Sequence, residues 1–141
     1  TSSPGFIGSG SAGGTEAAGI FTAMVPGDVT TSYEYASGTW TAGGALNQAR
    51  NRAASGAQAS QAQTLVFGGN IADATVKAST ELYDGTCWSV QADMNTARRG
   101  LGGAGSTSTS ALAFAGYTGS DQAATEEFTG AGPATKTITT S

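Results

Sequence analysis

The stretch LVFGGNIADATVKASTELYDGTCWSVQADMNTAR, residues 65–98, decides the fold of this chain. It opens with the apolar run 65–67 and a Gly-Gly pair, a pattern typical of a short buried strand that ends in a turn with unusual backbone angles. A second strand with its turn is expected at residues 81–85, and a third strand is centred on Trp88. Three short strands joined by Gly-based turns predict one antiparallel meander.

The landmarks of this stretch recur along the chain at one period. Phe21, Phe67 and Phe114 are spaced by 46 and 47 residues, Tyr35, Tyr83 and Phe128 by 48 and 45, Trp40 and Trp88 by 48, and Arg50 and Arg98 by 48. Each of the two arginines is the last residue of an Asn-x-Ala-Arg motif. Four landmarks kept in one order predict an array of similar units. We place the units at about residues 5–45, 50–94 and 99–141, within one domain that covers 1–141.

The order of these parts, an apolar run with Gly-Gly, then Tyr-Asp, then Trp, then Arg, resembles the kelch repeat, which forms one blade of a β-propeller. The short sequence motifs of the repeat look most like those in the kelch-like repeats of tailed-phage virion proteins, especially TELYDG (80–85), NTAR (95–98), GAG (103–105) and ALAFAGYTG (111–119). The resemblance implies an all-β, kelch-like β-propeller segment of about three four-stranded antiparallel blades.

Three blades are too few for a closed propeller, since propellers have about 4 to 8 blades. The ring is therefore expected to be completed by further blades or by a second copy of the chain. The first strand of each blade, rich in Gly and Ala, is expected nearest the axis, where large side chains would collide. The third unit lacks a Trp, and residues 131–141 are expected to form a terminal strand that caps the array.

Composition narrows the class of protein. Gly accounts for 22 of 141 residues and charged residues for 11%, where about 25% is typical, so a highly charged disordered chain and a helical protein are both disfavoured. The net charge is −4 and the six cations form no long basic run, which argues against a nucleic-acid partner. No apolar run approaches the length that a membrane-spanning helix requires, so no membrane span is expected.

Several kinds of catalytic site are excluded by residues that the chain lacks. The sequence contains no His, which rules out His-based acyl transfer, His-containing zinc sites and imidazole proton shuttles within this chain. Copper radical oxidases also carry kelch-type propellers, but their sites need His ligands, so the resemblance to that enzyme family stops at the scaffold. Cys87 is the only cysteine and is expected as a small side chain beside Trp88 in a strand. We predict no enzymatic activity and no cofactor.

The carboxylates admit a catalytic and a structural interpretation. Glu81 and Glu126 could form part of a glycosidase pair, but they stand 45 residues apart at the same place in successive units, as structural residues do. We therefore expect them to form ion pairs with Arg50 or Arg98 near a blade junction. The remaining candidates, Asp73, Asp93 and Asp121, are expected in loops and lack the Asp-x-Asp-x-Asp-Gly spacing of a calcium site, so no metal is predicted.

The aromatic residues divide into two groups. Trp40 and Trp88 could stack on sugars, but their repeated positions favour packing between adjacent blades. Tyr33 and Tyr117 break the period and are expected near loops. Tyr117 is the first choice for a ligand contact, together with Asp121 in the same loop. The loops 70–76 and 117–122 are the surfaces expected to meet a partner.

These observations predict a non-enzymatic virion structural protein, a fibre, spike or capsid decoration component outside the host cell. It would act as a rigid assembly or host-recognition scaffold, with other virion proteins, a host-surface glycan or protein, or a second copy as its partner. The alternative is a carbohydrate-binding or enzyme-associated propeller lobe of a secreted protein. An intracellular adaptor of the eukaryotic kelch type fits less well, because such a protein normally carries more charge and more Cys.

Overall fold

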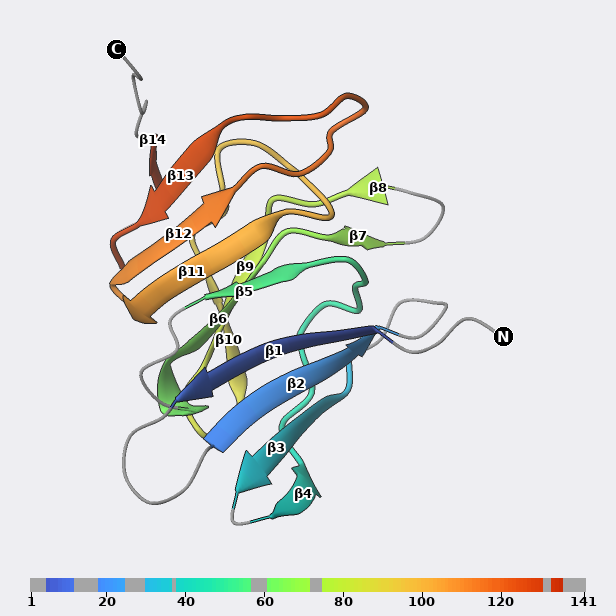
Figure 1. The fold of residues 1–141 in the computed structure, drawn as a ribbon, viewed down its shortest axis with the longest axis vertical. Coiled ribbons are helices and arrows are strands. Elements are labelled where there is room, and N and C mark those ends of the chain that lie inside the picture. The colour runs from blue at the N-terminus through green and yellow to red at the C-terminus, as the bar shows by residue number, and fades with distance from the viewer. Residues whose placement is uncertain are drawn as a thin grey trace.

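A computed structural model describes residues 5–11, 18–24, 30–36, 38–56, 61–71, 75–130 and 133–135. These residues form three four-stranded antiparallel sheets, a two-stranded sheet and one turn of 3-10 helix, η1 (Gln61–Gln63), and they contain no α-helix (Figure 1). The prediction of an all-β fold with antiparallel sheets is confirmed. The described part of the chain has no helix with the length and hydropathy needed to cross a membrane.

Each large sheet is built from four strands of one part of the chain. The first sheet has the order β1 (Gly5–Ser11), β2 (Ala18–Met24), β3 (Ser32–Ala36), β4 (Thr39–Ala42). The second has the order β5 (Ala54–Gly56), β6 (Thr64–Phe67), β9 (Thr80–Tyr83), β10 (Trp88–Gln91). The third has the order β11 (Gly102–Thr107), β12 (Ser110–Phe114), β13 (Thr125–Phe128), β14 (Pro133–Thr135). The small sheet pairs β7 (Asn70–Ile71) with β8 (Thr75–Val76), between β6 and β9 in the chain.

The stretch 65–98 forms the meander that its sequence predicts. β6 pairs with β9, with Phe67 opposite Thr80, and β9 pairs with β10, with Tyr83 opposite Trp88. The glycines after β6 have φ values of +59° at Gly68 and +93° at Gly69, a region that favours glycine. The chain therefore leaves the second sheet here and enters β7.

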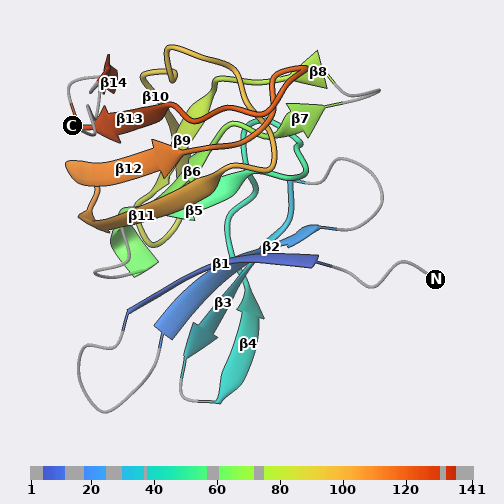
Figure 2. The same ribbon diagram turned by 45° about the horizontal axis from the view of Figure 1, so that its top comes forward.

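The three large sheets lie next to one another with their first strands on the inside (Figures 1 and 2). β5 contacts both β1 and β11. The approach of β5 to β11 is so close that a Cβ on Gly103 would overlap the carbonyl oxygen of Ser55, and a Cβ on Gly56 would lie 3.1 Å from the carbonyl oxygen of Ala104. The small residues in these strands are thus required where the sheets converge.

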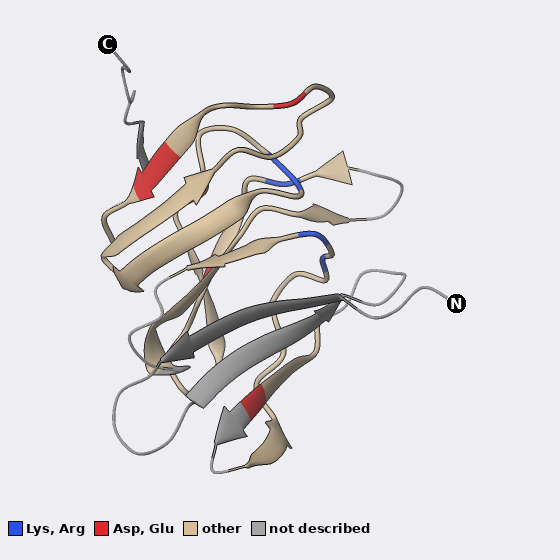
Figure 3. Cartoon of the chain, viewed as in Figure 1, with Lys and Arg blue, Asp and Glu red and all other residues tan. Residues whose placement is uncertain are grey.

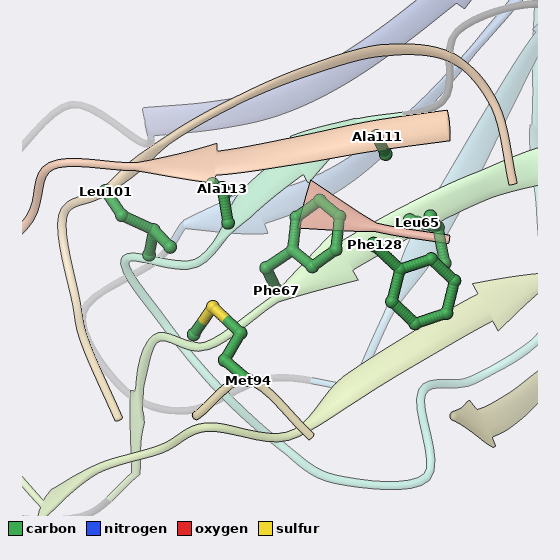
Figure 4. Packing of buried hydrophobic residues seen from close by; sticks show 8 residues of the cluster. Leu65, Phe67, Met94, Leu101, Ala111, Ala113 and Phe128 are labelled. Atoms are coloured by element: carbon green, nitrogen blue, oxygen red, sulfur yellow. The ribbon is translucent and has the colours of Figure 1, made fainter. Parts of the chain in front are cut away.

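The larger core cluster lies between the second and third sheets (Figure 4). Its buried members are Ala54, Leu65, Phe67, Met94, Leu101, Ala111, Ala113 and Phe128. The rings of Phe67 and Phe128 face each other across the junction, with centroids 6.3 Å apart and planes tilted by 60°. Leu65 and Phe67 of the second sheet share this cluster with Ala111 and Ala113 of the third.

The second cluster, Leu46, Ala53, Val66, Tyr83 and Trp88, fills the junction between the first and second sheets. The indole of Trp88 is 5.0 Å from the Tyr83 ring, and its Nε1 donates a hydrogen bond of 3.3 Å to Oγ of Ser32 in β3. Trp88 therefore packs between two sheets.

The prediction that Trp40 packs in the same way is wrong. Trp40 is 51% exposed, whereas Trp88 is 5% exposed. Both residues stand opposite a tyrosine in the final hairpin of their sheet, Tyr35 and Tyr83. The difference arises because Trp88 has the first sheet beside it, whereas Trp40 lies on the outer side of the first sheet.

Two smaller expectations also need correction. Cys87 is exposed and lies in the turn before β10, not in a strand. The segment 70–76 contains β7 and β8 and is not a loop throughout, whereas Tyr33, the second residue of β3, lies next to a loop as expected. Residues 133–135 of the expected terminal strand form β14, and Asp73 lies outside the described residues.

The turn between β9 and β10 is closed by Asp84. Its Oδ1 accepts hydrogen bonds of 2.9 Å from the backbone N–H groups of Thr86 and Cys87, as in a turn capped by an Asp side chain. These bonds stabilise the carboxylate and hold the pKa of Asp84 below its usual value. The neighbouring carboxylate raises the pKa of the Cys87 thiol, so this exposed cysteine is a poor nucleophile.

Candidate functional site

Two buried ion pairs occupy equivalent places at the two junctions between sheets. Nη2 of Arg50 lies 2.6 Å from Oε1 of Glu81, and Nη2 of Arg98 lies 2.7 Å from Oε1 of Glu126. All four side chains are buried. The predicted ion pairs are confirmed.

The two arginines also bind the backbone in the same manner. Nη1 of Arg50 donates to the carbonyl groups of Gly68 and Ser79, at 3.0 and 2.8 Å. Nη1 of Arg98 donates to those of Ala115 and Ala124, at 3.0 and 2.7 Å. Burial lowers the pKa of Arg50, and the charge of Glu81 opposes that effect.

The two glutamates hold the segment that precedes their own sheet. Glu81 accepts hydrogen bonds from the backbone N–H groups of Asn47 and Gln48, at 2.7 and 3.1 Å. Glu126 accepts the corresponding bonds from Asn95 and Thr96, at 2.5 and 3.2 Å. Carboxylates whose oxygens are buried and already bonded to an arginine and two amides are placed for structure, not for attack on a substrate.

A third polar contact joins the first and second sheets. The hydroxyl of Tyr83 donates to Oε1 of Glu34, and the backbone N–H of Gly44 donates to the same hydroxyl at 3.4 Å. Burial, followed by the hydrogen bond to Glu34, raises the pKa of Tyr83 from its ordinary value near 10 to about 12. The folded state thus binds this proton more tightly than the unfolded chain.

This pKa shift predicts a loss of stability at alkaline pH. Because the folded-state pKa is raised, the contribution of Tyr83 is complete below about pH 10 and is lost as pH rises through about 12. Urea unfolding of the wild type is expected to show a steeper fall in free energy over this range than Tyr83→Phe. The other three tyrosines are present in both proteins, so the difference between the two curves isolates Tyr83. Parallel curves would contradict the assignment.

The hollow that we take as the candidate binding site lies at the loop end of the third sheet. Its volume is about 460 Å³, and its lining residues are Arg52, Arg99, Gly100, Ala115, Gly116, Tyr117, Asp121 and Gln122. Figure 3 shows the described basic positions gathering at the end of the sheets where β7 and β8 lie. Two guanidinium groups and one carboxylate give this hollow a positive balance, although the whole chain carries −4.

The loop after β12 forms one wall of the hollow. Ala115 and Gly116 have φ values of +58° and +98° and turn the chain sharply out of the sheet. The backbone N–H of Gln122 then donates to the carbonyl of Gly116 at 2.9 Å and closes the loop. Within the loop, Tyr117 and Asp121 pair as an isolated bridge. A short loop held at both ends in this way keeps its side chains in place.

The other wall comes from the segments that join the sheets. Arg99 and Tyr117 exchange two backbone hydrogen bonds, of 3.1 and 2.9 Å, and the Arg99 guanidinium lies over the Tyr117 ring, 5.2 Å from its centroid. Gly100 N–H donates to the carbonyl of Arg52 at 2.8 Å. Arg52 itself has a φ of +52°. This bond brings together the segments before the second and third sheets, and with them the two arginines.

The same backbone arrangement occurs one unit earlier with different side chains. Asn51 and Asn70 exchange two backbone hydrogen bonds, of 3.0 and 2.9 Å, and stand at the places of Arg99 and Tyr117 in the preceding unit. The backbone pairing is therefore the same in both units, but the side chains are two amides in the second unit and a cation and an aromatic ring, Arg99 and Tyr117, in the third. A change of side chain at a place where the backbone structure is repeated is typical of a position used for binding.

The structure places both predicted contact residues, Tyr117 and Asp121, in the lining of this hollow. Gln122 belongs to the loop 117–122 that the sequence predicted as a contact surface, whereas sequence reasoning missed Arg52 and Arg99. The change from Asn51 to Arg99 was a usable signal, because it breaks the repeat at equivalent places of successive units. No group of three or more His, Cys, Asp or Glu side chains suited to a metal ion occurs in the described part of the chain.

The chain was compared with protein-family models and with curated proteins, and neither comparison finds a match.

Proposed function

We propose that this chain is a kelch-like β-propeller segment of a non-enzymatic virion structural protein, a fibre, spike or capsid decoration component, that recognises an acidic glycan on the host surface. The observation that carries the proposal is the hollow formed by Arg52, Arg99, Tyr117 and Asp121 on a framework of repeated sheets. The sequence motifs of the repeat support the virion assignment. The buried ion pairs supply the rigidity that a scaffold needs.

The chemistry of the hollow favours a sugar that carries a carboxylate. A guanidinium group binds a carboxylate through two parallel hydrogen bonds, and two such groups line the hollow. Tyr117 is 38% exposed and offers an apolar ring surface and a hydroxyl, while Asp121 and Gln122 can hydrogen-bond sugar hydroxyls. A neutral sugar offers no carboxylate to the two guanidinium groups, so affinity should depend on the acidic group.

Binding to matched acidic and neutral oligosaccharides tests this proposal. The purified chain is expected to bind sialylated or uronate-containing oligosaccharides saturably and their neutral counterparts much more weakly. Arg99→Ala should weaken binding by about tenfold or more, since a hydrogen bond to a charged group contributes about 1.5–3 kcal/mol. Lys77→Ala is the matched control, because it removes one positive charge from a residue that does not line the hollow.

Equal binding of acidic and neutral oligosaccharides would contradict the proposed recognition, and so would equal losses in Arg99→Ala and Lys77→Ala. The virion assignment has a separate test, in which purified particles are analysed for the chain by mass spectrometry. Binding of acidic oligosaccharides by a chain that is absent from particles would favour the alternative, a carbohydrate-binding propeller lobe of a secreted protein.

A further inference from the structure

The outer face of the third sheet exposes apolar side chains in a regular pattern. Along β12, Ala111 and Ala113 are buried against the second sheet, whereas Leu112 and Phe114 point the other way and are 37% and 39% exposed. On β13, Thr125 stands opposite Phe114 and Glu127 stands opposite Leu112, so both lie on the same face. This face is built from two neighbouring strands and not from a single protruding residue.

The same pattern is covered one unit earlier. Leu65 and Phe67 stand at the places of Leu112 and Phe114 in the preceding unit, and they are 0% and 1% exposed. They are buried because the third sheet packs on them, with the ring of Phe128 against Phe67. The outer face of the third sheet thus repeats the apolar residues of β6 that the second sheet uses to bind its neighbour, with Glu127 at the place of Leu82.

The outer face of the first sheet carries the matching half of such a junction. Trp40 and Tyr33 are 51% and 42% exposed there. Trp40 stands opposite Tyr35, as Trp88 stands opposite Tyr83. In the second sheet, the Trp and Tyr of this pair are buried against the first sheet. Each end of the array therefore presents one of the two faces that meet inside the chain.

We propose that the first sheet of a second copy packs on the outer face of the third sheet, and that the third sheet of that copy packs on the first sheet of this one. The internal junction supplies the expected contact. Trp88 donates from its indole to the hydroxyl of Ser32, and Thr125 stands at the place of Ser32 in the third unit, with Thr80 at that place in the second. In the new junction, Trp40 of one copy meets Thr125 of the other.

A second copy fits these faces better than an unrelated partner does. The two faces are different from each other and complementary, so a head-to-tail contact forms at both ends of a pair. Such a closed pair covers Trp40, Leu112 and Phe114 in both copies at once, and it joins six sheets in one ring. An unrelated partner would cover one face and leave the other exposed.

The mass in solution of the purified 141-residue chain tests the proposal. Light scattering after size-exclusion chromatography is expected to give twice the single-chain mass of 13.8 kDa at micromolar concentrations. Leu112→Asp and Trp40→Asp should each return the mass to that of one chain, because a charge is placed in the buried contact. Val90→Asp is the matched control: Val90 is 65% exposed on β10, outside both faces, and this variant should stay at the higher mass.

Mixing the two variants distinguishes a head-to-tail contact from any other. Leu112→Asp retains an intact first sheet, and Trp40→Asp retains an intact third sheet, so one junction can form between them. An equimolar mixture is expected to regain a species of twice the single-chain mass, while each variant alone stays monomeric. Far-UV circular dichroism of both variants checks that they are folded. A wild type that stays at the mass of one chain, a ladder of larger species, or a mixture without recovery would overturn the proposal.

Discussion

Replacing Arg98 by alanine is expected to lower the free energy of unfolding by about 3–5 kcal/mol, which is the usual cost of removing one partner of a buried ion pair. Arg98 is fully buried, and its guanidinium bonds to Glu126 and to the carbonyl groups of Ala115 and Ala124. The variant would leave the buried carboxylate of Glu126 without its counter-charge and would remove the bonds from the guanidinium to the two carbonyl groups. Since domains of this size are stable by about 5–15 kcal/mol, the loss is a large share of the total.

Urea unfolding at one fixed protein concentration measures this effect. Arg99→Ala is the matched control, because it removes the same side chain at the next position and should cost no more than about 1 kcal/mol, the value of a partly exposed cation–π contact. Adding Glu126→Gln to Arg98→Ala should recover part of the stability, since the lone buried charge is then gone. Equal losses at Arg98 and Arg99 would show that the buried pair does not stabilise the junction.

Phe67→Ala is expected to cost about 3–5 kcal/mol, as large-to-small changes at buried aromatic positions usually do. Phe67 is 1% exposed at the centre of the cluster between the second and third sheets, where its ring faces that of Phe128. Its removal leaves a cavity that the neighbouring sheets cannot fill, because β5 and β11 already touch at Gly103 and Ser55.

Thermal and urea unfolding of this variant would show the loss directly. Val90→Ala lies in the same sheet, is 65% exposed before substitution, and should change the free energy by no more than about 0.5 kcal/mol. If Phe67→Ala were as stable as Val90→Ala, the second and third sheets would not be held together by this cluster.

The repeat in the sequence was sufficient to predict the strands and the charge pairs. Glu81 and Glu126 recur at a similar offset from Arg50 and Arg98, and a buried charge at a repeated position requires a partner of opposite sign. The glycines after β6 likewise indicated a turn. These features depend on residues that lie within one unit or in adjacent units, where spacing alone is informative.

Burial at the ends of the array could not be predicted in this way. Trp40 and Trp88 occur in equivalent hairpins, yet among the described residues a sheet packs against Trp88 alone, and spacing does not show which hairpin has a neighbour. The spacing of residues in the sequence also could not predict that the lining residues of the hollow come together. Arg52 and Tyr117 are far apart in the sequence and meet only because the segments before two successive sheets bond to each other.

The ion pairs between each joining segment and the sheet that follows it, Arg50–Glu81 and Arg98–Glu126, have a consequence for synthesis on the ribosome. Each arginine leaves the exit tunnel well before its partner, since Arg50 precedes Glu81 and Arg98 precedes Glu126 by most of a sheet. Until its glutamate has emerged, each arginine has no counter-charge at the junction and stays hydrated. Two successive units therefore dock firmly only after the glutamate of the later unit has been made. A nascent chain that stops short of Glu126 contains Arg98 without its counter-charge, so Arg98 cannot be buried.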